Sequence, residues 1–193
     1  PYIGKNALDA QILAYNSISA LRQQLLPTEK IHGIITNGGE SANIIPDYTR
    51  SSWMMRAQKT SGLKVLERKI LNCFKSAATA TGCSLNVIDG NGTYENLVTD
   101  KELANIFMNY SQELGVDMKT NKDFDQTKNG STDFGNISKK YPSLHAFLAI
   151  VPDDGKIVNH QPEFADATVT PEAKKAIRNG SVLLAATILK LQK

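Results

Sequence analysis

The first 115 residues alternate between segments with the period of an α-helix and segments with the composition of a β-strand. Apolar residues recur with the helical period at residues 7–26, 62–81 and 100–114. Strand-like segments lie between these helices, namely KIHGIIT, YTRSSWMMRA and SLNVID. The order helix, strand, strand, helix, strand, helix predicts an α+β sandwich in which helices cover one face of a mainly antiparallel sheet.

The predicted helices have recognisable ends. Asn, Ser and Thr are typical N-caps because their side chains accept hydrogen bonds from the free N–H groups of the first turn. Gly tolerates the left-handed backbone conformation that ends many helices. The expected N-caps are Asn6, Ser61, Thr99 and Thr170, and the expected terminators are Gly82 and Gly115.

The rest of the chain has a different organisation. A polar stretch, VDMKTNKDFDQTKNGST, precedes a strand-like segment, LHAFLAIV, a polar loop and a final helix with Pro171 in its first turn. One strand and one helix cannot enclose a hydrophobic core, so this part is expected to pack against sequence outside the 193 residues. The first residue is Pro1 rather than Met, which also indicates a processed chain or a piece of a longer one.

Composition argues against two classes of partner. The net charge of +3 arises from 22 basic and 19 acidic residues that are interspersed, without the basic stripe that nucleic acids require. No apolar run approaches the roughly 20 residues that cross a membrane. We therefore expect no nucleic acid and no membrane as partners. Five Asn-x-Ser/Thr sequons leave secretion open.

The three histidines lie in different contexts. His160 stands in the polar loop between the predicted strand and the final helix, where a neutral imidazole could bind zinc or could simply be a surface side chain. His145 falls within the strand-like segment, where a hydrogen-bonded histidine of the core or its rim is the ordinary interpretation. His32 begins a strand and is expected to be a surface or turn residue.

The segment GSTDFG, residues 130–135, brings two hydroxyls, a carboxylate and glycine amides close together. Ser131, Thr132 and Asp133 could orient a ligand there. The same residues could equally form a turn that caps the next helix. The sequence favours neither interpretation.

Asn43 and Arg56 are thirteen residues apart and flank a predicted strand. We expect both to reach the same end of adjacent antiparallel strands. An amide donor beside a guanidinium suits a carboxylate. The alternative is a turn asparagine and an unrelated surface arginine.

Four ordered segments resemble the metallopeptidase-20 family, the aminoacylase and carboxypeptidase-like amidohydrolases. They are PYIGKNALDAQILAYNSISALRQQL, IHGIITNGGESANIIPD with the arginine that follows it, GSTDFGNIS and NHQPEF. The nearest branch is that of the dipeptidase-like, peptidase-20-domain-containing proteins. The resemblance implies that residues 1–117 are a lid and dimerisation domain, a ferredoxin-like sandwich with a four-stranded antiparallel sheet and two helices. Residues 118–193 would be the C-terminal portion of an α/β zinc-peptidase domain, whose N-terminal portion is absent from this chain.

The resemblance also implies roles for individual residues. His160 would be a metal ligand in a site for two divalent ions, zinc or else manganese or cobalt, that is mostly built by residues absent from this chain. Asn43 and Arg56 would bind the substrate carboxylate in the partner subunit's site. Three residues of the GSTDFG segment, together with a weaker match, would line the substrate side: Ser131, Thr132, Asp133 and His145.

The function expected from this resemblance is metal-dependent hydrolysis of the amide bond in a small N-acyl amino acid or dipeptide. Its partners would be the N-terminal portion of the same protein, a second subunit bound through the lid, and a small carboxylate-bearing substrate. This chain alone is not expected to be active. The alternatives are an inactive relative that binds or stores a small ligand, and a ferredoxin-like interaction module. The family favours a cytoplasmic location.

Overall fold

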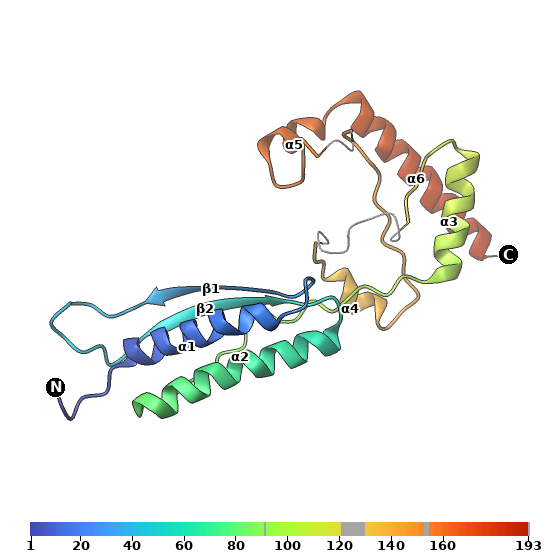
Figure 1. Ribbon diagram of the computed structural model, residues 1–193. Helices are drawn as coiled ribbons and strands as arrows, with labels where there is room; N and C mark the ends of the chain where they lie inside the picture. The colour runs from blue at the N-terminus through green and yellow to red at the C-terminus, as the bar shows by residue number, and fades with distance from the viewer. Residues whose placement is uncertain (91, 121–129, 153–154, 193) are drawn as a thin grey trace. The chain divides into compact units, whose positions relative to one another are not determined.

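The computed structural model describes residues 1–90, 92–120, 130–152 and 155–192 (Figure 1). Within them the chain forms two compact units, which divide after Asn96. The first unit contains helices and a two-stranded antiparallel sheet, and the elements described in the second unit are helices. None of the helices in these ranges is long and apolar enough to cross a membrane.

The first unit, residues 1–96, is built from two long helices and a hairpin. Helix α1 spans Ala7–Leu21 and is followed by a short 3-10 turn at Arg22–Gln24, and α2 spans Thr60–Thr81. Strand β1, Lys30–Asn37, pairs antiparallel with β2, Arg50–Arg56. In Figure 1 both helices run beside the hairpin, and α1 packs on α2.

The core of the first unit joins both helices to the sheet. Its buried residues are Ile18, Ile31, Leu66 and Ile70, which come from α1, β1 and α2. Trp53 of β2 lies over Gly33, its cross-strand partner, where any side chain would collide with the indole ring. The helical period of the sequence therefore identifies the residues that meet the sheet.

Local signals at the helix ends are mostly confirmed. The Asn6 side chain accepts hydrogen bonds from the N–H groups of Leu8, at 2.9 Å, and Asp9, at 3.2 Å. Gly82 ends α2 with a φ of 68°, the left-handed conformation that glycine adopts without strain. Two expectations are wrong by one or two positions: Lys59 precedes α2, so Ser61 is not its cap, and Asp100 rather than Thr99 caps α3.

Truncating the central core leucine should strongly destabilise the protein. Leu66 is 1% exposed, so we expect Leu66→Ala to lower the free energy of unfolding of the full-length protein by about 3 kcal/mol through lost burial and a residual cavity. Its neighbour Val65 is 41% exposed, and Val65→Ala should cost less than about 1 kcal/mol. Urea unfolding of both variants measures the difference. Equal losses would contradict this core.

The second unit, from residue 97 onward, contains α3 at Lys101–Glu113, α4 at Phe134–Ser138, α5 at Pro162–Ala167 and α6 at Pro171–Leu191. Helix α3 packs on α6 and buries Phe107, while α6 buries Leu183. Thr170 caps α6 as expected, accepting a hydrogen bond from the Ala173 N–H at 3.3 Å, and Pro171 stands in its first turn.

The sheet is smaller than the sequence predicts. Neither SLNVID nor LHAFLAIV forms a strand, and a four-stranded sandwich is not found in the described residues. A strand forms only where a neighbour accepts and donates its backbone hydrogen bonds. Strands β1 and β2 of the hairpin supply these hydrogen bonds to each other. No described strand pairs with SLNVID or LHAFLAIV.

The compact units also divide earlier than the lid boundary expected at residue 117. Helix α3 packs with the second unit, because its buried face meets α6. Most of the polar stretch expected to join the domains, at 121–129, lies outside the described residues. The assignment of the first unit as a lid stays a prediction.

Candidate functional site

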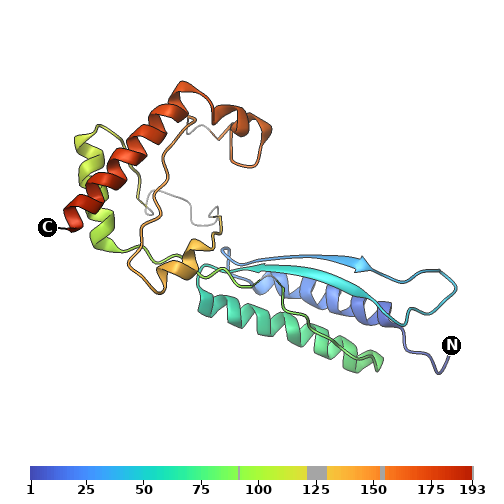
Figure 2. The ribbon, with the colours of Figure 1, turned by 180° about the vertical axis from the view of Figure 1, so that it is seen from behind.

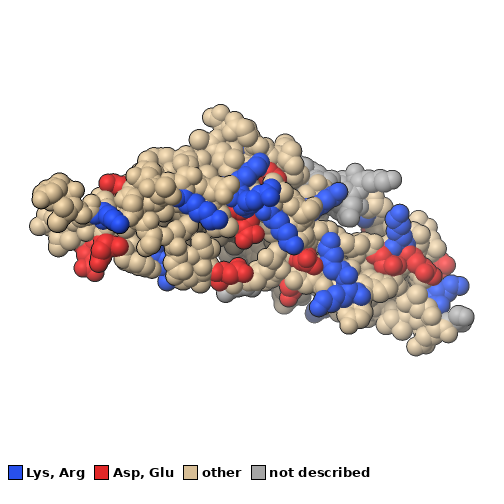
Figure 3. All heavy atoms as spheres, turned by 90° about the horizontal axis from the view of Figure 1, so that it is seen from below, with Lys and Arg blue, Asp and Glu red and all other residues tan. Residues whose placement is uncertain are grey.

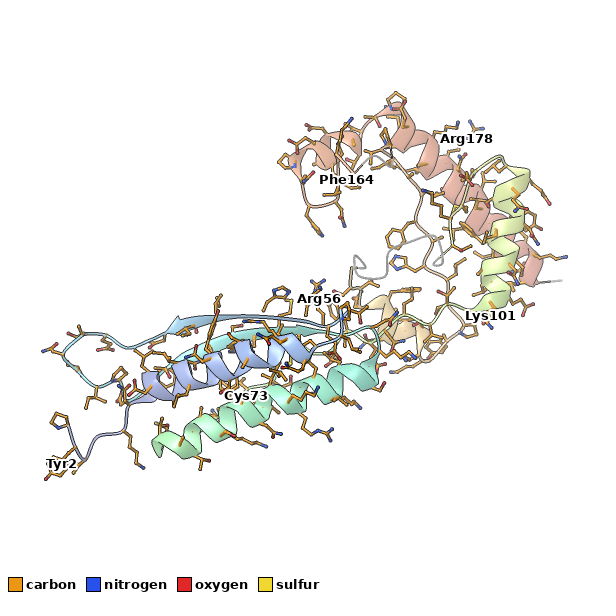
Figure 4. All side chains as sticks on the ribbon, in the orientation of Figure 1. Tyr2, Arg56, Cys73, Lys101, Phe164 and Arg178 are labelled. Atoms are coloured by element: carbon orange, nitrogen blue, oxygen red, sulfur yellow. The ribbon has the colours of Figure 1, made fainter. Side chains whose placement is uncertain are left out.

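Arg56 lies at the last position of β2, and its side chain is exposed (Figure 4). Its cross-strand partner is Lys30, the first residue of β1. Asn43 lies in the loop that joins the two strands, beyond Asn37, and its Oδ1 accepts a hydrogen bond of 2.6 Å from the Ser41 hydroxyl. Six residue steps of β2 separate its two ends by about 20 Å.

The expectation that Asn43 and Arg56 reach the same end of the hairpin is therefore wrong. The connecting loop marks one end, and Arg56 stands at the other. The thirteen residues from Asn43 to Arg56 are the rest of the loop and the whole of β2. The chain therefore runs from one end of the hairpin to the other between these two residues. One chain cannot bring both side chains to one carboxylate by means of this hairpin.

Lys30 is a residue that the sequence analysis missed. It stands directly opposite Arg56, and both side chains are exposed on one face of the sheet. Like charges at directly opposed positions repel each other, and an anion between them would remove that penalty. The register of the hairpin is what places Lys30 beside Arg56, because the first residue of β1 pairs with the last residue of β2.

The Ser-Thr-Asp turn leads into α4. The Thr132 hydroxyl oxygen accepts a hydrogen bond from the Phe134 N–H at 3.2 Å, so this side chain forms the local turn. The side chain of Asp133 is exposed and makes no capping hydrogen bond, although it directly precedes the helix. Ser131 is exposed as well. The capping interpretation therefore holds for Thr132 only.

His145 lies beside this turn. Its ring packs between Phe134, at a centroid distance of 5.0 Å, and Phe147, at 4.6 Å. Its Nδ1 is buried and makes no hydrogen bond within the described residues. His145 therefore contacts Phe134, the residue that directly follows the Ser-Thr-Asp turn. The hydrogen-bonded core histidine of the ordinary interpretation is not observed.

His160 stands in the loop just before α5 and is exposed. Its φ of 70° makes it the one non-glycine residue with positive φ in the described part of the chain. A non-glycine side chain in this conformation is uncommon, costs on the order of 1 kcal/mol and is often found at functional positions. Phe164, four residues on, belongs to α5 (Figure 4).

The fit to a metal ion is partial. An exposed imidazole on irregular backbone can act as one ligand. Residues 1–90, 92–120, 130–152 and 155–192 contain no group of three or more His, Cys, Asp or Glu side chains that could hold an ion. The described residues therefore supply fewer than three ligands to a site of the expected kind.

Within the described residues, neither the charges on the face shown in Figure 3 nor the two cysteines indicate a further site. Basic and acidic side chains are interspersed over the face shown in Figure 3. Burial against the core raises the pKa of the Cys73 thiol, which keeps it protonated and unsuited to nucleophilic attack. Both cysteines are free.

Comparison with known proteins defines the class. No protein-family model matches the chain. The chain is 37% identical over 189 residues to the Xaa-Arg dipeptidase of Homo sapiens and 36% identical to that of Mus musculus. Each match covers 98% of this chain and 43% of the relative, so the chain spans less than half the length of these curated relatives.

The chain is therefore a relative of dipeptidases. More particularly, its match to the Xaa-Arg dipeptidases confirms the resemblance to the dipeptidase-like branch of the metallopeptidase-20 family.

Proposed function

We propose that the full-length protein containing this sequence is a metal-dependent dipeptidase. Its substrates would be small dipeptides or N-acyl amino acids that carry a free carboxylate, and Xaa-Arg dipeptides are the first class to test. The observation that carries the proposal is the 37% identity with an Xaa-Arg dipeptidase over 98% of the chain.

Within this proposal His160 is a ligand of one divalent metal ion. The exposed imidazole and the strained backbone support that role. When bound, such an ion, zinc or else manganese or cobalt, polarises a carbonyl group and activates water. The other ligands and the catalytic acid or base come from sequence outside this chain, so the chain alone performs no hydrolysis.

The turn around Asp133 lines the substrate side of the site. Its exposed carboxylate and the exposed Ser131 hydroxyl are available for polar contacts, while Thr132 holds the turn in place. His145 supports this turn through the ring of Phe134 and has an Nδ1 without a partner among the described residues. These four residues act by binding and orienting the substrate.

Arg56 and Asn43 complete carboxylate binding across a homodimer. Because they stand at opposite ends of one hairpin, a site that uses both takes Arg56 from one subunit and Asn43 from the other. Two-fold symmetry then builds two equivalent sites. Lys30 adds a second positive charge beside Arg56 and favours the carboxylate end of the substrate.

A substrate panel tests the proposed specificity. The purified full-length protein is incubated with Gly-Arg, Gly-Lys, Gly-Leu and the C-terminal amide of Gly-Arg, and free amino acid is quantified. We expect hydrolysis of Gly-Arg and at least about 100-fold slower turnover of the amide, which lacks the charged group that Arg56 binds. Equal rates for the acid and the amide would contradict the carboxylate site.

The panel also addresses the alternative of a binding or storage protein. Such a protein would bind Gly-Arg, as measured by calorimetry, and release no free arginine after prolonged incubation with added zinc or manganese. That result would overturn the proposed enzymatic function.

A further inference from the structure

One segment of the second unit is attached to two helices and carries aromatic rings. Residues 142–149 form neither helix nor strand, and they run from the loop after α4 toward α5 (Figure 2). The Ser143 carbonyl accepts a hydrogen bond of 2.8 Å from the N–H of Asp100, the cap of α3. Leu148 packs against Gly180 of α6, where an added Cβ would lie 2.9 Å from the leucine Cδ1. The segment is therefore fixed to both α3 and α6, which pack on each other.

Three rings form a row beside this segment. The His145 ring lies 5.0 Å from the Phe134 ring and 4.6 Å from the Phe147 ring, at interplanar angles of 50° and 36°. Both distances are in the range of favourable aromatic pairs. Residues two apart in an extended chain share one side, so His145 and Phe147 lie together and Leu148 points away from them. Phe147 ends the row and is 75% exposed, which leaves most of its ring open to a ligand.

A carboxylate without a partner stands next to the row of rings. Asp133 directly precedes Phe134, and its exposed side chain makes no hydrogen bond or ion pair within the described residues. Its backbone is held on both sides: the Phe134 N–H donates to the Thr132 hydroxyl, and the Asn136 N–H donates to the Asp133 carbonyl at 2.9 Å. The turn therefore fixes the position of Asp133 and leaves its charge for a ligand.

The proposed carboxylate-binding residues cannot receive a second cation. Arg56 and Lys30 are both positively charged and stand opposite each other, so they repel a basic side chain. A dipeptide that ends in a basic residue therefore needs an anionic partner for its side chain elsewhere. Among the residues that the proposed function places at the substrate, Asp133 is the one acid.

We propose that Asp133 and the exposed ring of Phe147 bind the cationic side chain of the substrate's C-terminal residue and set a preference for arginine. The inference rests on the proposed dipeptidase function. A guanidinium group is flat, stacks on an aromatic face and donates two parallel hydrogen bonds to a carboxylate. The lysine ammonium uses the same partners only as a point charge. Phe134 and His145 hold the Phe147 ring in place.

Citrulline separates charge from shape in the test of this proposal, because its ureido group has the outline of a guanidinium without the charge. The full-length protein with its metal is assayed on Gly-Arg and Gly-citrulline. We expect kcat/KM to be at least about 10-fold higher for Gly-Arg. Asp133→Asn should lower this value by about 10- to 100-fold for Gly-Arg and by less than about two-fold for Gly-citrulline.

Two further variants sharpen the result. Phe147→Leu keeps an apolar side chain but removes the ring, and it should lower kcat/KM for Gly-Arg alone, by about 2- to 30-fold. Glu113→Gln removes an exposed carboxylate at the end of α3 and should change neither substrate. Equal rates for the two substrates in the wild type overturn the proposal. So does a loss in Asp133→Asn that is the same for both, which would mean that Asp133 does not read the side chain.

Binding of the free amino acids separates this inference from the proposed function. Arginine and citrulline carry the same carboxylate and cannot be hydrolysed, so calorimetry on the wild-type protein measures the side-chain preference alone. An affinity at least about 10-fold higher for arginine, lost in Asp133→Asn, supports the inference even if no dipeptide is cleaved. Equal affinities, or no binding of either amino acid, overturn it even if Gly-Arg is hydrolysed.

Discussion

Replacing His160 by alanine in the full-length protein is expected to lower the rate of Xaa-Arg hydrolysis by more than about 100-fold, since even the partners that orient a metal ligand contribute 10- to 100-fold. The same variant should bind less metal per subunit. Its exposed position implies little loss of packing, so the fold should remain intact. Steady-state kinetics and elemental analysis of the purified protein measure both effects.

A glycine at this position separates ligation from backbone geometry. The φ of 70° at His160 suits glycine, so His160→Gly should unfold no more readily than the wild type in the absence of metal. It should nevertheless lose metal and activity as fully as the alanine variant. Asn159→Ala changes the preceding residue of the same loop and should leave both unchanged. Full activity in His160→Gly would show that the imidazole is not a ligand.

Mixing the Arg56→Ala and Asn43→Ala variants should restore part of the activity that each variant has lost. Arg56→Ala removes a charge-assisted hydrogen bond of about 1.5–3 kcal/mol, which raises KM by roughly 10- to 100-fold, and Asn43→Ala should act in the same direction. A dimer that contains one subunit of each variant has one intact site. Random exchange between the two variants should therefore restore about a quarter of the wild-type activity.

The mixing experiment has two controls, and the first uses the arginine at the other end of β2. Arg50→Ala removes an exposed arginine from the opposite end of β2 and should leave KM within about two-fold. Each variant mixed with itself should gain nothing. If tagged subunits demonstrably exchange and no activity returns, Asn43 and Arg56 act in the same chain, contrary to the geometry of the hairpin.

Features that depend on one turn of chain could be predicted from the sequence. The caps Asn6 and Thr170 and the terminator Gly82 act through contacts within four residues, so their chemistry is visible in the local sequence. The amphipathic faces that bury Ile18 and Leu66 follow from the helical period alone. Each of these is confirmed.

Features that depend on distant partners could not be predicted in this way. The segments SLNVID and LHAFLAIV have strand composition, but pairing requires a neighbouring strand, and the described residues provide none. The position of Arg56 opposite Lys30 follows from the register of the hairpin, which the spacing to Asn43 does not reveal.

In the candidate site, too, some features follow from the local sequence and others depend on the folded chain. The Ser-Thr-Asp turn was identified from adjacent residues, and Thr132 does form it. The packing of His145 between Phe134 and Phe147 joins residues on either side of a loop, and the positive φ of His160 is a property of the folded backbone. Neither has a signature in the local sequence.

The most direct test of the proposed function combines metal content with hydrolysis of one substrate. The full-length protein is stripped with a chelator, dialysed and titrated with zinc or manganese, while release of arginine from Gly-Arg is followed. We predict no release from the stripped protein and a rise in rate that saturates as ions bind stoichiometrically. Hydrolysis that continues undiminished in the metal-free protein would contradict the account, as would a fully loaded protein that releases no arginine.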